Sequence, residues 1–229
     1  MAGSTDPRNP RLRPPDGEGD PIGTFRGERP RTHNGNEEGK TAWLDESFRE
    51  HESDGFYIIA GTILDPASEA NARLAMRSLK GPRHTAKLHW TEMDRTERKD
   101  AAQIVAAQKG LHVVSIGAPV PRRRQERARS KCLSALVVEL HGFGISRLCL
   151  EARQEELNAR DVRTIAAVRQ TVLPRGTVMR AEHIPGAKEP LLWISDIVAG
   201  AVRTQRLGDS CYTDLLGETL IDFDVSTDC

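Results

Sequence analysis

The sequence predicts an α/β domain in which helices flank a central mixed β-sheet. Apolar segments at residues 41–46 and 56–64 are separated by a polar turn, which is typical of a hairpin. From residue 66 onward, segments with helical spacing alternate with short apolar runs. An early antiparallel pair followed by alternating strands and helices indicates a sheet with both antiparallel and parallel neighbours.

The first five elements are defined by apolar runs and by residues that start or stop helices. Pro66 is typical of a helix entry, Thr91 is a suitable N-cap, and Gly110 is a suitable helix stop. We expect, in order, strands at 41–46 and 56–64, a helix at 66–79, a strand at 86–90 and a helix at 91–110.

The later elements alternate regularly between strand and helix. Residues 142–146, "GFGIS", form a turn between two elements and lack the pattern of a dinucleotide-binding loop. We expect strands at 111–120, 146–153 and 177–184, and helices at 122–144, 154–173 and 190–207.

The chain divides into an arm, a domain and an extension. Residues 1–40 contain six prolines and seven glycines but few apolar side chains, so they cannot offset their ordering entropy and we expect them to be disordered. The remaining chain is long enough for one substantial domain, which we place at 41–208, followed by a C-terminal extension at 209–229.

Composition narrows the classes of partner. The 33 basic and 33 acidic residues cancel, so a nucleic-acid-binding surface would have to be local. No apolar run approaches the roughly 18 residues that span a membrane, and the first residues lack the apolar core of a signal peptide. The four cysteines show no CxxC spacing, which argues against a zinc knuckle or a redox pair. We therefore expect a cytoplasmic protein with no membrane partner.

One near-match to a known motif is rejected. Residues 34–41, "NGNEEGKT", approach the phosphate-binding sequence G-x-x-x-x-G-K-[ST], but Asn34 stands where the first glycine belongs. That loop needs a strand before it and a helix after it, so that amides at the helix start can contact phosphate. Here a strand is expected directly after it, so we do not expect a nucleotide triphosphatase.

Acidic residues recur at the ends of predicted elements. Asp45 and Glu46 close the first strand, and Glu151 closes the strand that begins at residue 146. Glu92 lies in the first turn of a predicted helix, where a carboxylate is worth only about 0.3–1 kcal/mol through the helix dipole. Each could simply mark an exit to solvent. Asp196 is harder to explain, because it interrupts an apolar helix, where an unpartnered carboxylate costs several kcal/mol or takes up a proton.

A shared cation would explain these acids together. Carboxylates that converge in a cleft repel one another unless a divalent cation neutralises them, and oxygen ligands without His or Cys favour Mg²⁺ or Mn²⁺. Two such ions a few ångströms apart can position the attacking water and the leaving oxygen of a phosphodiester. The order of the acids along the chain is similar to that of ribonuclease H-like nucleases.

Two short motifs carry a more specific resemblance. Asp45-Glu46-Ser47 after the first strand, and Asp196 with Ala199 and Gly200 in the last helix, resemble the family called domain of unknown function 3800. The resemblance covers residues 41–207 and implies a ribonuclease H-like fold. A lysine before the first acidic helix and an acid at a later strand end correspond to Lys87 and Glu151. This chain departs from the family pattern at Phe48, which replaces a glycine, and at Ser195, which replaces an alanine.

Two functions remain open on this basis. The first is a metal-dependent phosphodiesterase, a nuclease, that acts on nucleic acid by a two-metal-ion mechanism. Its metal ligands would be Asp45, Glu92, Glu151 and Asp196, with Glu46 as an additional catalytic acid or alternate ligand. The second is a catalytically silent ribonuclease H-like module that binds nucleic acid or a protein.

Several basic residues are candidates for phosphate contact. Arg122, Arg123 and Arg124 precede a predicted helix, where cations oppose the helix dipole, so local stability does not explain them. Lys87 and His89 lie near the first acidic helix, where they could contact a phosphate or shuttle a proton. A solvated charged face, an ordinary strand histidine and a strand-edge lysine are the alternatives.

Overall fold

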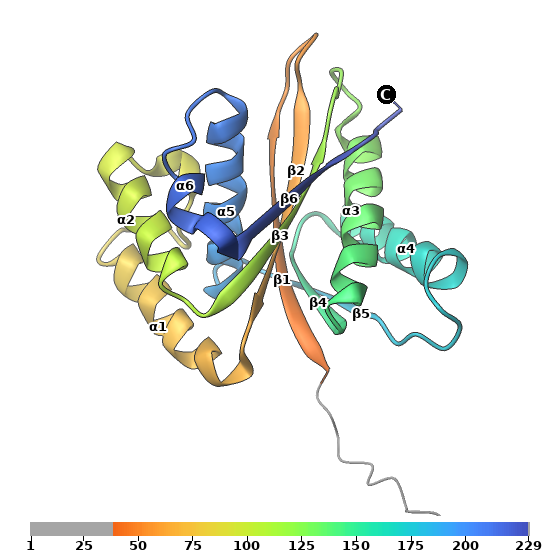
Figure 1. The fold of residues 1–229 in the computed structure, drawn as a ribbon, viewed down its shortest axis with the longest axis horizontal. Coiled ribbons are helices and arrows are strands. Elements are labelled where there is room, and N and C mark those ends of the chain that lie inside the picture. Colours follow the sequence, from red (N-terminus) through yellow and green to blue (C-terminus); the bar gives the residue numbers. More distant parts are fainter. Residues whose placement is uncertain (1–38, 229) are drawn as a thin grey trace, which may run out of the picture. The chain divides into compact units, whose positions relative to one another are not determined.

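A six-stranded mixed sheet lies between two layers of helices in the computed structural model, which describes residues 39–228 (Figure 1). Helices α1 (Glu69–Lys80), α2 (Arg95–Ala106), α5 (Leu191–Arg206) and α6 (Thr213–Leu216) cover one face. Helices α3 (Gln125–Gly142) and α4 (Glu155–Thr171) cover the other. The predicted α/β class, with a mixed sheet flanked by helices, is confirmed.

The strand order combines a meander with parallel neighbours. The strands are β1 (Lys40–Arg49), β2 (Phe56–Leu64), β3 (Gly110–Gly117), β4 (Ile145–Glu151), β5 (Arg180–Ile184) and β6 (Leu220–Val225). Their order across the sheet is β5-β4-β1-β2-β3-β6. Strands β1, β2 and β3 pair antiparallel in sequence, whereas β4 pairs parallel with β1, β5 with β4, and β6 with β3.

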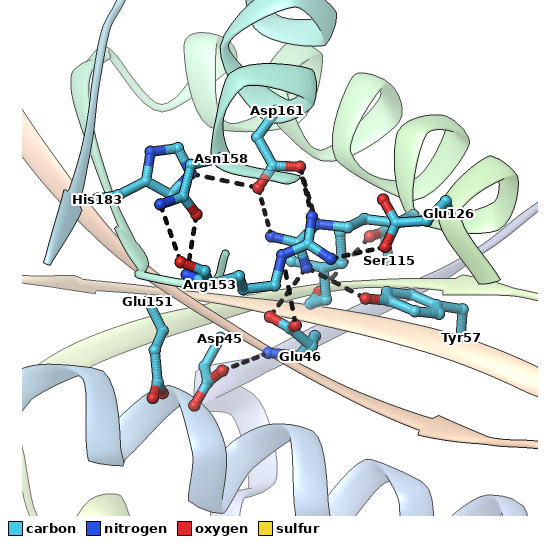
Figure 2. A network of polar contacts seen from close by, with 12 residues as sticks. Asp45, Glu46, Tyr57, Ser115, Glu126, Glu151, Arg153, Asn158, Asp161 and His183 are labelled. Atoms are coloured by element: carbon cyan, nitrogen blue, oxygen red, sulfur yellow. Dashed lines mark hydrogen bonds and ion pairs between the residues drawn. The ribbon is translucent and has the colours of Figure 1, made fainter. Parts of the chain in front are cut away.

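Strand β1 contributes to two separate cores because its side chains alternate between the faces of the sheet. Trp43 packs into the core beneath α1, α2 and α5. Ala42 and Leu44 pack into the core beneath α3 and α4. Continuing this period of two, Asp45 points toward the α5 side and Glu46 toward the α3 side (Figure 2). The two acids therefore belong to different faces although they are adjacent in sequence.

The end of β4 leaves a step in the sheet. The pairing of β1 with β4 stops at Leu44 and Leu150, but β1 continues to Arg49, paired only with β2. The expectation that Asp45 and Glu46 close the first strand is wrong, because the β2 partner extends the strand beyond them. The strand that ends beside these two acids is β4, whose last residue is Glu151.

The segment before α2 differs from the prediction. No strand forms at residues 86–90; instead the chain enters a 3-10 helix at Trp90–Glu92. Helix α2 begins at Arg95 because Asp94 accepts a hydrogen bond from the Glu97 amide at 2.9 Å, while the Glu97 carboxylate accepts one from the Asp94 amide. Thr91 is therefore not the N-cap.

The segment 209–229, expected as an extension, adds α6 and the edge strand β6 to the fold. Sequence reasoning missed this sixth strand, whose residues Leu220–Val225 include two aspartates. The prediction that residues 1–40 are disordered falls almost entirely outside the described residues. Within residues 39–228, no helix has both the length and the apolar character needed to cross a membrane.

Candidate functional site

A cleft of about 330 Å³ lies at the step where β4 ends beside β1. It is lined by residues of both faces of β1, by the end of β4, by the segment before α2 and by α5. In α/β sheets, crevices at the carboxyl ends of strands, where connections leave in opposite directions, are the usual ligand sites. Here β1 leads to β2 on one side, and β4 leads through α4 to β5 on the other.

Four of the five predicted acids line this cleft, namely Asp45, Glu46, Glu151 and Asp196. Asp45 comes from β1, Glu151 from the last position of β4, and Asp196 from the second turn of α5. Burial and the charges of Asp196, Glu46 and Glu151 raise the pKa of Asp45 well above its usual value. Burial also raises the pKa of Asp196. The cleft therefore concentrates negative charge that the surrounding protein only partly neutralises.

Lys87 supplies the nearest positive charge. Its ammonium donates to both carboxylate oxygens of Glu151 and lies 4.0 Å from Oδ2 of Asp45. Burial alone would lower the pKa of Lys87, but the charge of Asp45 and the hydrogen bond to Glu151 raise it overall. Gly186 makes room for this pair, because a Cβ there would lie 2.6 Å from Oε1 of Glu151.

Helix α5 is fixed beneath the sheet by Ser195. The Ser195 hydroxyl donates to the Trp43 carbonyl at 2.7 Å and lies 3.0 Å from the Thr62 hydroxyl. The Thr62 hydroxyl in turn meets Nδ1 of His112 at 3.1 Å, and burial lowers the pKa of His112 to about 4. The imidazole ring is therefore neutral. The hydrogen bonds of Ser195 fix helix α5 against β1 and β2, and so fix the position of the adjacent Asp196.

The backbone amide of Trp90 orients Asp196, donating to its Oδ2 at 2.7 Å. This bond depends on Gly200, one turn further along α5, because a Cβ there would lie 2.1 Å from the Trp90 ring. Gly200 thus has a packing role: the indole of Trp90 lies against the bare backbone of α5. The bend of chain at Trp90–Glu92 brings both Lys87 and the Trp90 amide to the cleft.

We expect Gly200→Ala to lower the free energy of unfolding by about 1–3 kcal/mol, the usual cost of overpacking a dense core. The displaced Trp90 ring should also change its fluorescence emission, because the ring is only 3% exposed in the native fold. Urea denaturation followed by tryptophan emission measures both effects.

Gly142→Ala is the matched control for this substitution. A Cβ at Gly142, the last residue of α3, meets nothing within 4 Å. That variant should be neutral or slightly more stable, since alanine favours helix over glycine. Equal stabilities for the two variants would refute the packing role assigned to Gly200.

Glu46 occupies a network on the opposite face of the sheet (Figure 2). Its carboxylate pairs with Arg129 at 2.9 Å and lies 4.0 Å from Nε of Arg153. Arg129 donates to both oxygens of Asp161 at 2.8 Å, and it also donates to the Tyr57 hydroxyl at 3.1 Å. The negative charge of Glu46 therefore balances buried arginines on the α3 side of the sheet. Glu46 also lines the cleft, where the sequence predicts it as an additional catalytic acid or ligand.

Glu92 does not join the other acids. It lies exposed in the 3-10 turn and is not among the residues that line the cleft. Its assignment as a ligand assumed that a helix begins at Thr91. Because the helix begins at Arg95, the Glu92 side chain leaves the chain in a different direction.

The basic candidates separate into two groups. Lys87 and His89 line the cleft, as the phosphate-contact prediction requires. Arg122, Arg123 and Arg124 are exposed, precede α3 and do not line it. Arg122 faces the exposed Glu52 at 3.7 Å.

Two arginines that line the cleft were not predicted from the sequence. Arg203 lies seven residues after Asp196, which places both on one face of α5, and this spacing could have revealed it. Its Nε is buried without a hydrogen-bond partner, and among residues 39–228 no carboxylate forms an ion pair with it. Arg153 lies two residues after Glu151 and lines the side of the cleft that faces α4.

The cleft offers oxygen donors for a divalent cation but no preformed cage. Mg²⁺ usually takes one or two protein carboxylates and completes its shell with water and substrate phosphate. Asp45 and Asp196 meet that requirement, whereas Glu151 is engaged by Lys87. No three His, Cys, Asp or Glu side chains of the described chain are arranged to hold a metal ion. The donors therefore fit one cation more closely than the four-ligand, two-ion centre expected from the sequence.

Comparison with known proteins adds no assignment. No family model matches the chain, and no curated protein matches it either.

Proposed function

We propose that the protein is a phosphodiesterase that cleaves nucleic acid with the help of Mg²⁺ or Mn²⁺. The observation that carries the proposal is the convergence of Asp45, Glu151 and Asp196 from three separate elements into one cleft. A three-stranded meander followed by two parallel strands joined through helices also agrees with the ribonuclease H-like fold that the sequence resembles.

In this proposal, carboxylates of the cleft bind the cation and cationic side chains contact the phosphate. Asp45 and Asp196 would hold the cation between β1 and α5. When bound, such a cation neutralises phosphate charge and lowers the pKa of a coordinated water. Lys87 can contact a phosphate oxygen once it exchanges Glu151 for substrate, which frees the Glu151 carboxylate to accept a proton from water. Arg203, which forms no ion pair with a carboxylate in the described part of the chain, would supply a second positive charge for the phosphate.

The direct test uses the full chain and end-labelled single- and double-stranded DNA and RNA. Cleavage should require Mg²⁺ or Mn²⁺ and stop on chelation. It should also be lost in Asp196→Asn, which keeps the shape of the side chain but removes its charge. Cleavage that continues undiminished in that variant would reject the proposal.

A catalytically silent binding module is the second candidate, and one observation favours it. The Lys87 ammonium already lies between Glu151 and Asp45, where it neutralises charge without a metal. The two candidates differ in whether the remaining carboxylates accept a cation.

Lys87→Met separates them by titration calorimetry with Mn²⁺. At 4 Å and an effective dielectric constant of about 20, two unit charges interact by roughly 4 kcal/mol, so removing the ammonium should tighten Mn²⁺ binding by at least about tenfold. Lys188→Met, at an exposed position, makes the same change in net charge and should leave the affinity unaltered. A silent module should show no Mn²⁺ site tighter than millimolar in either variant.

A further inference from the structure

A second polar cavity, of about 310 Å³, lies between α3 and α4. Three arginines line it: Arg127 from α3, and Arg160 and Arg163 from α4. Ser130 and Thr164 lie between them, with their hydroxyl oxygens 3.2 Å apart. The cavity therefore combines guanidinium groups with hydroxyl groups, and both are common hydrogen-bond donors to phosphate oxygens in proteins.

The two acids of this cavity are already committed elsewhere. Asp161 accepts from Arg129 at 2.8 Å, from Arg153 at 3.1 Å and lies 3.2 Å from Nε2 of His183. Glu126 accepts from Arg153 at 2.7 Å. Neither carboxylate faces the three cavity arginines closely enough to form an ion pair.

The cavity arginines lack close carboxylate partners. Within residues 39–228, none of the three forms an ion pair; the Nε of Arg127 donates to the Thr227 carbonyl at 3.4 Å. The hydrogen bond from Lys131 and, at longer range, the charge of Arg127 lower the pKa of the Asp228 carboxyl. These three arginines lie on the two helices that form one cavity, which sets them apart from single exposed cations such as Lys99 and Arg180. Since the whole chain has no net charge, this is a local excess of positive charge.

Arg153 connects the cavity with the cleft. Its guanidinium lines the cleft, and its donors reach Glu126 and Asp161, which line the cavity between the helices. Arg153 therefore contacts residues of both sites. A chain of phosphates that entered the cleft could continue over Arg153 into the space between α3 and α4.

We propose that the α3–α4 groove, defined by Arg127, Ser130, Arg160, Arg163 and Thr164, binds the phosphodiester backbone of a nucleic acid that extends from the cleft. This inference rests on the proposed function for the identity of the polyanion. The groove contacts flanking phosphates, so it sets affinity and takes no part in bond cleavage. Arg123 and Arg124, predicted from the sequence to contact phosphate, directly precede α3 but do not line the groove.

The test measures binding without cleavage. Full-length protein in chelator is titrated into fluorescent single-stranded DNA or RNA, and anisotropy is followed over a range of KCl concentrations. Arg160→Gln/Arg163→Gln should lower the slope of log K against log salt by about 1.4, which corresponds to roughly 25-fold weaker binding at about 0.1 M salt. Both residues are exposed and form no ion pair with another described residue, so the variant should fold like the parent.

Arg169→Gln/Arg175→Gln is the matched control. It removes the same charge from the end of α4 and the following turn, at positions that do not line the groove. Equal slopes for the two double variants would overturn the proposal. So would equal competition by a phosphopeptide of matched charge, or by inorganic phosphate at matched charge concentration, because the groove would then bind anions without preference for a phosphodiester chain.

A small substrate separates this inference from the proposed function. Bis(p-nitrophenyl) phosphate fits the cleft without reaching the groove, so its Mn²⁺-dependent hydrolysis should be unchanged in Arg160→Gln/Arg163→Gln. Loss of nucleic-acid binding with retained hydrolysis supports the groove. Normal binding with altered hydrolysis contradicts it, and absent hydrolysis in the parent protein contradicts the proposed chemistry alone.

Discussion

Asp45→Asn is expected to abolish cation-dependent cleavage while making the folded protein more stable. The asparagine keeps the side-chain oxygen that accepts the Glu46 amide at 2.8 Å, so the local backbone should not change. It removes one of the two carboxylates available to a cation. Losing even an outer partner of a metal ligand costs about 10–100-fold, so we expect a loss of more than about a hundredfold for a direct ligand.

The gain in stability should depend on pH with a definite sign. Because burial and neighbouring carboxylates raise the folded-state pKa of Asp45, the folded protein binds more protons than the unfolded chain between pH 3.8 and that raised pKa. The free energy of unfolding of the parent therefore falls as pH rises through this window. The free energy of unfolding of Asp45→Asn does not fall in this window. The variant should therefore exceed the parent in stability by the full amount above the folded-state pKa of Asp45, and by nothing below about pH 4.

Asp100→Asn provides the comparison, since Asp100 is exposed on α2 and its loss changes net charge equally. It should alter neither cleavage nor the pH dependence. Urea denaturation at several pH values and a cleavage assay measure the two effects separately. A destabilised Asp45→Asn protein, or one that cleaves at the parent rate, would remove the basis for a charged, cation-binding cleft.

The sequence predicts the sheet well because its strands and helices differ in apolar period. The hairpin of β1 and β2 and the later strands β3, β4 and β5 were visible as runs and spacings, whereas the run at 86–90 predicted a strand that does not form. Strand β6 was not, because an edge strand with few buried side chains lacks a continuous apolar run. Its aspartates at residues 222 and 224 resemble those of a solvated tail.

Within the site, the acid that local structure could not explain lies in the cleft. This is Asp196, inside an apolar helix. Glu92 obeyed an ordinary rule for helix starts, and it proved to be an exposed residue of a turn. Asp45 and Glu151 also had an ordinary explanation, as strand ends, and yet both line the cleft, so a local explanation alone did not separate site residues from the rest.

Sequence reasoning could not separate Asp45 from Glu46. Adjacent residues on a strand point to opposite faces, so only one of them can face α5, and the choice depends on which face each core covers. Nor did the sequence reveal that Arg129, within an arginine-rich run, is 2% exposed while the other arginines of that run are exposed. That burial is decided by the approach of α4, which brings Asp161 from 32 residues away.

Arg129→Met is expected to lower the free energy of unfolding by about 3–5 kcal/mol, because it leaves carboxylates of Asp161 and Glu46 buried without their principal cation. Methionine fills a similar space, so lost packing is a minor part of the effect. Lys131→Met, two residues further along α3, breaks an exposed pair with Asp228 and should leave the free energy of unfolding almost unchanged. Urea denaturation compares the two variants directly.

The loss of unfolding free energy in Arg129→Met should be largest where Asp161 is ionised. Burial alone would raise the pKa of Asp161, but hydrogen bonds from Arg129 and His183 lower it overall, so its contribution to stability is present above pH 3.8 and is lost as pH falls further. Without Arg129 the pKa should rise, and the cost of the substitution should shrink as the carboxyl takes up a proton in acid. Arg129→Met/Asp161→Leu removes both charges and should recover most of the lost stability, because apolar replacement of a buried pair is often neutral. If the double variant is as unstable as the single one, the network acts through shape and not through charge.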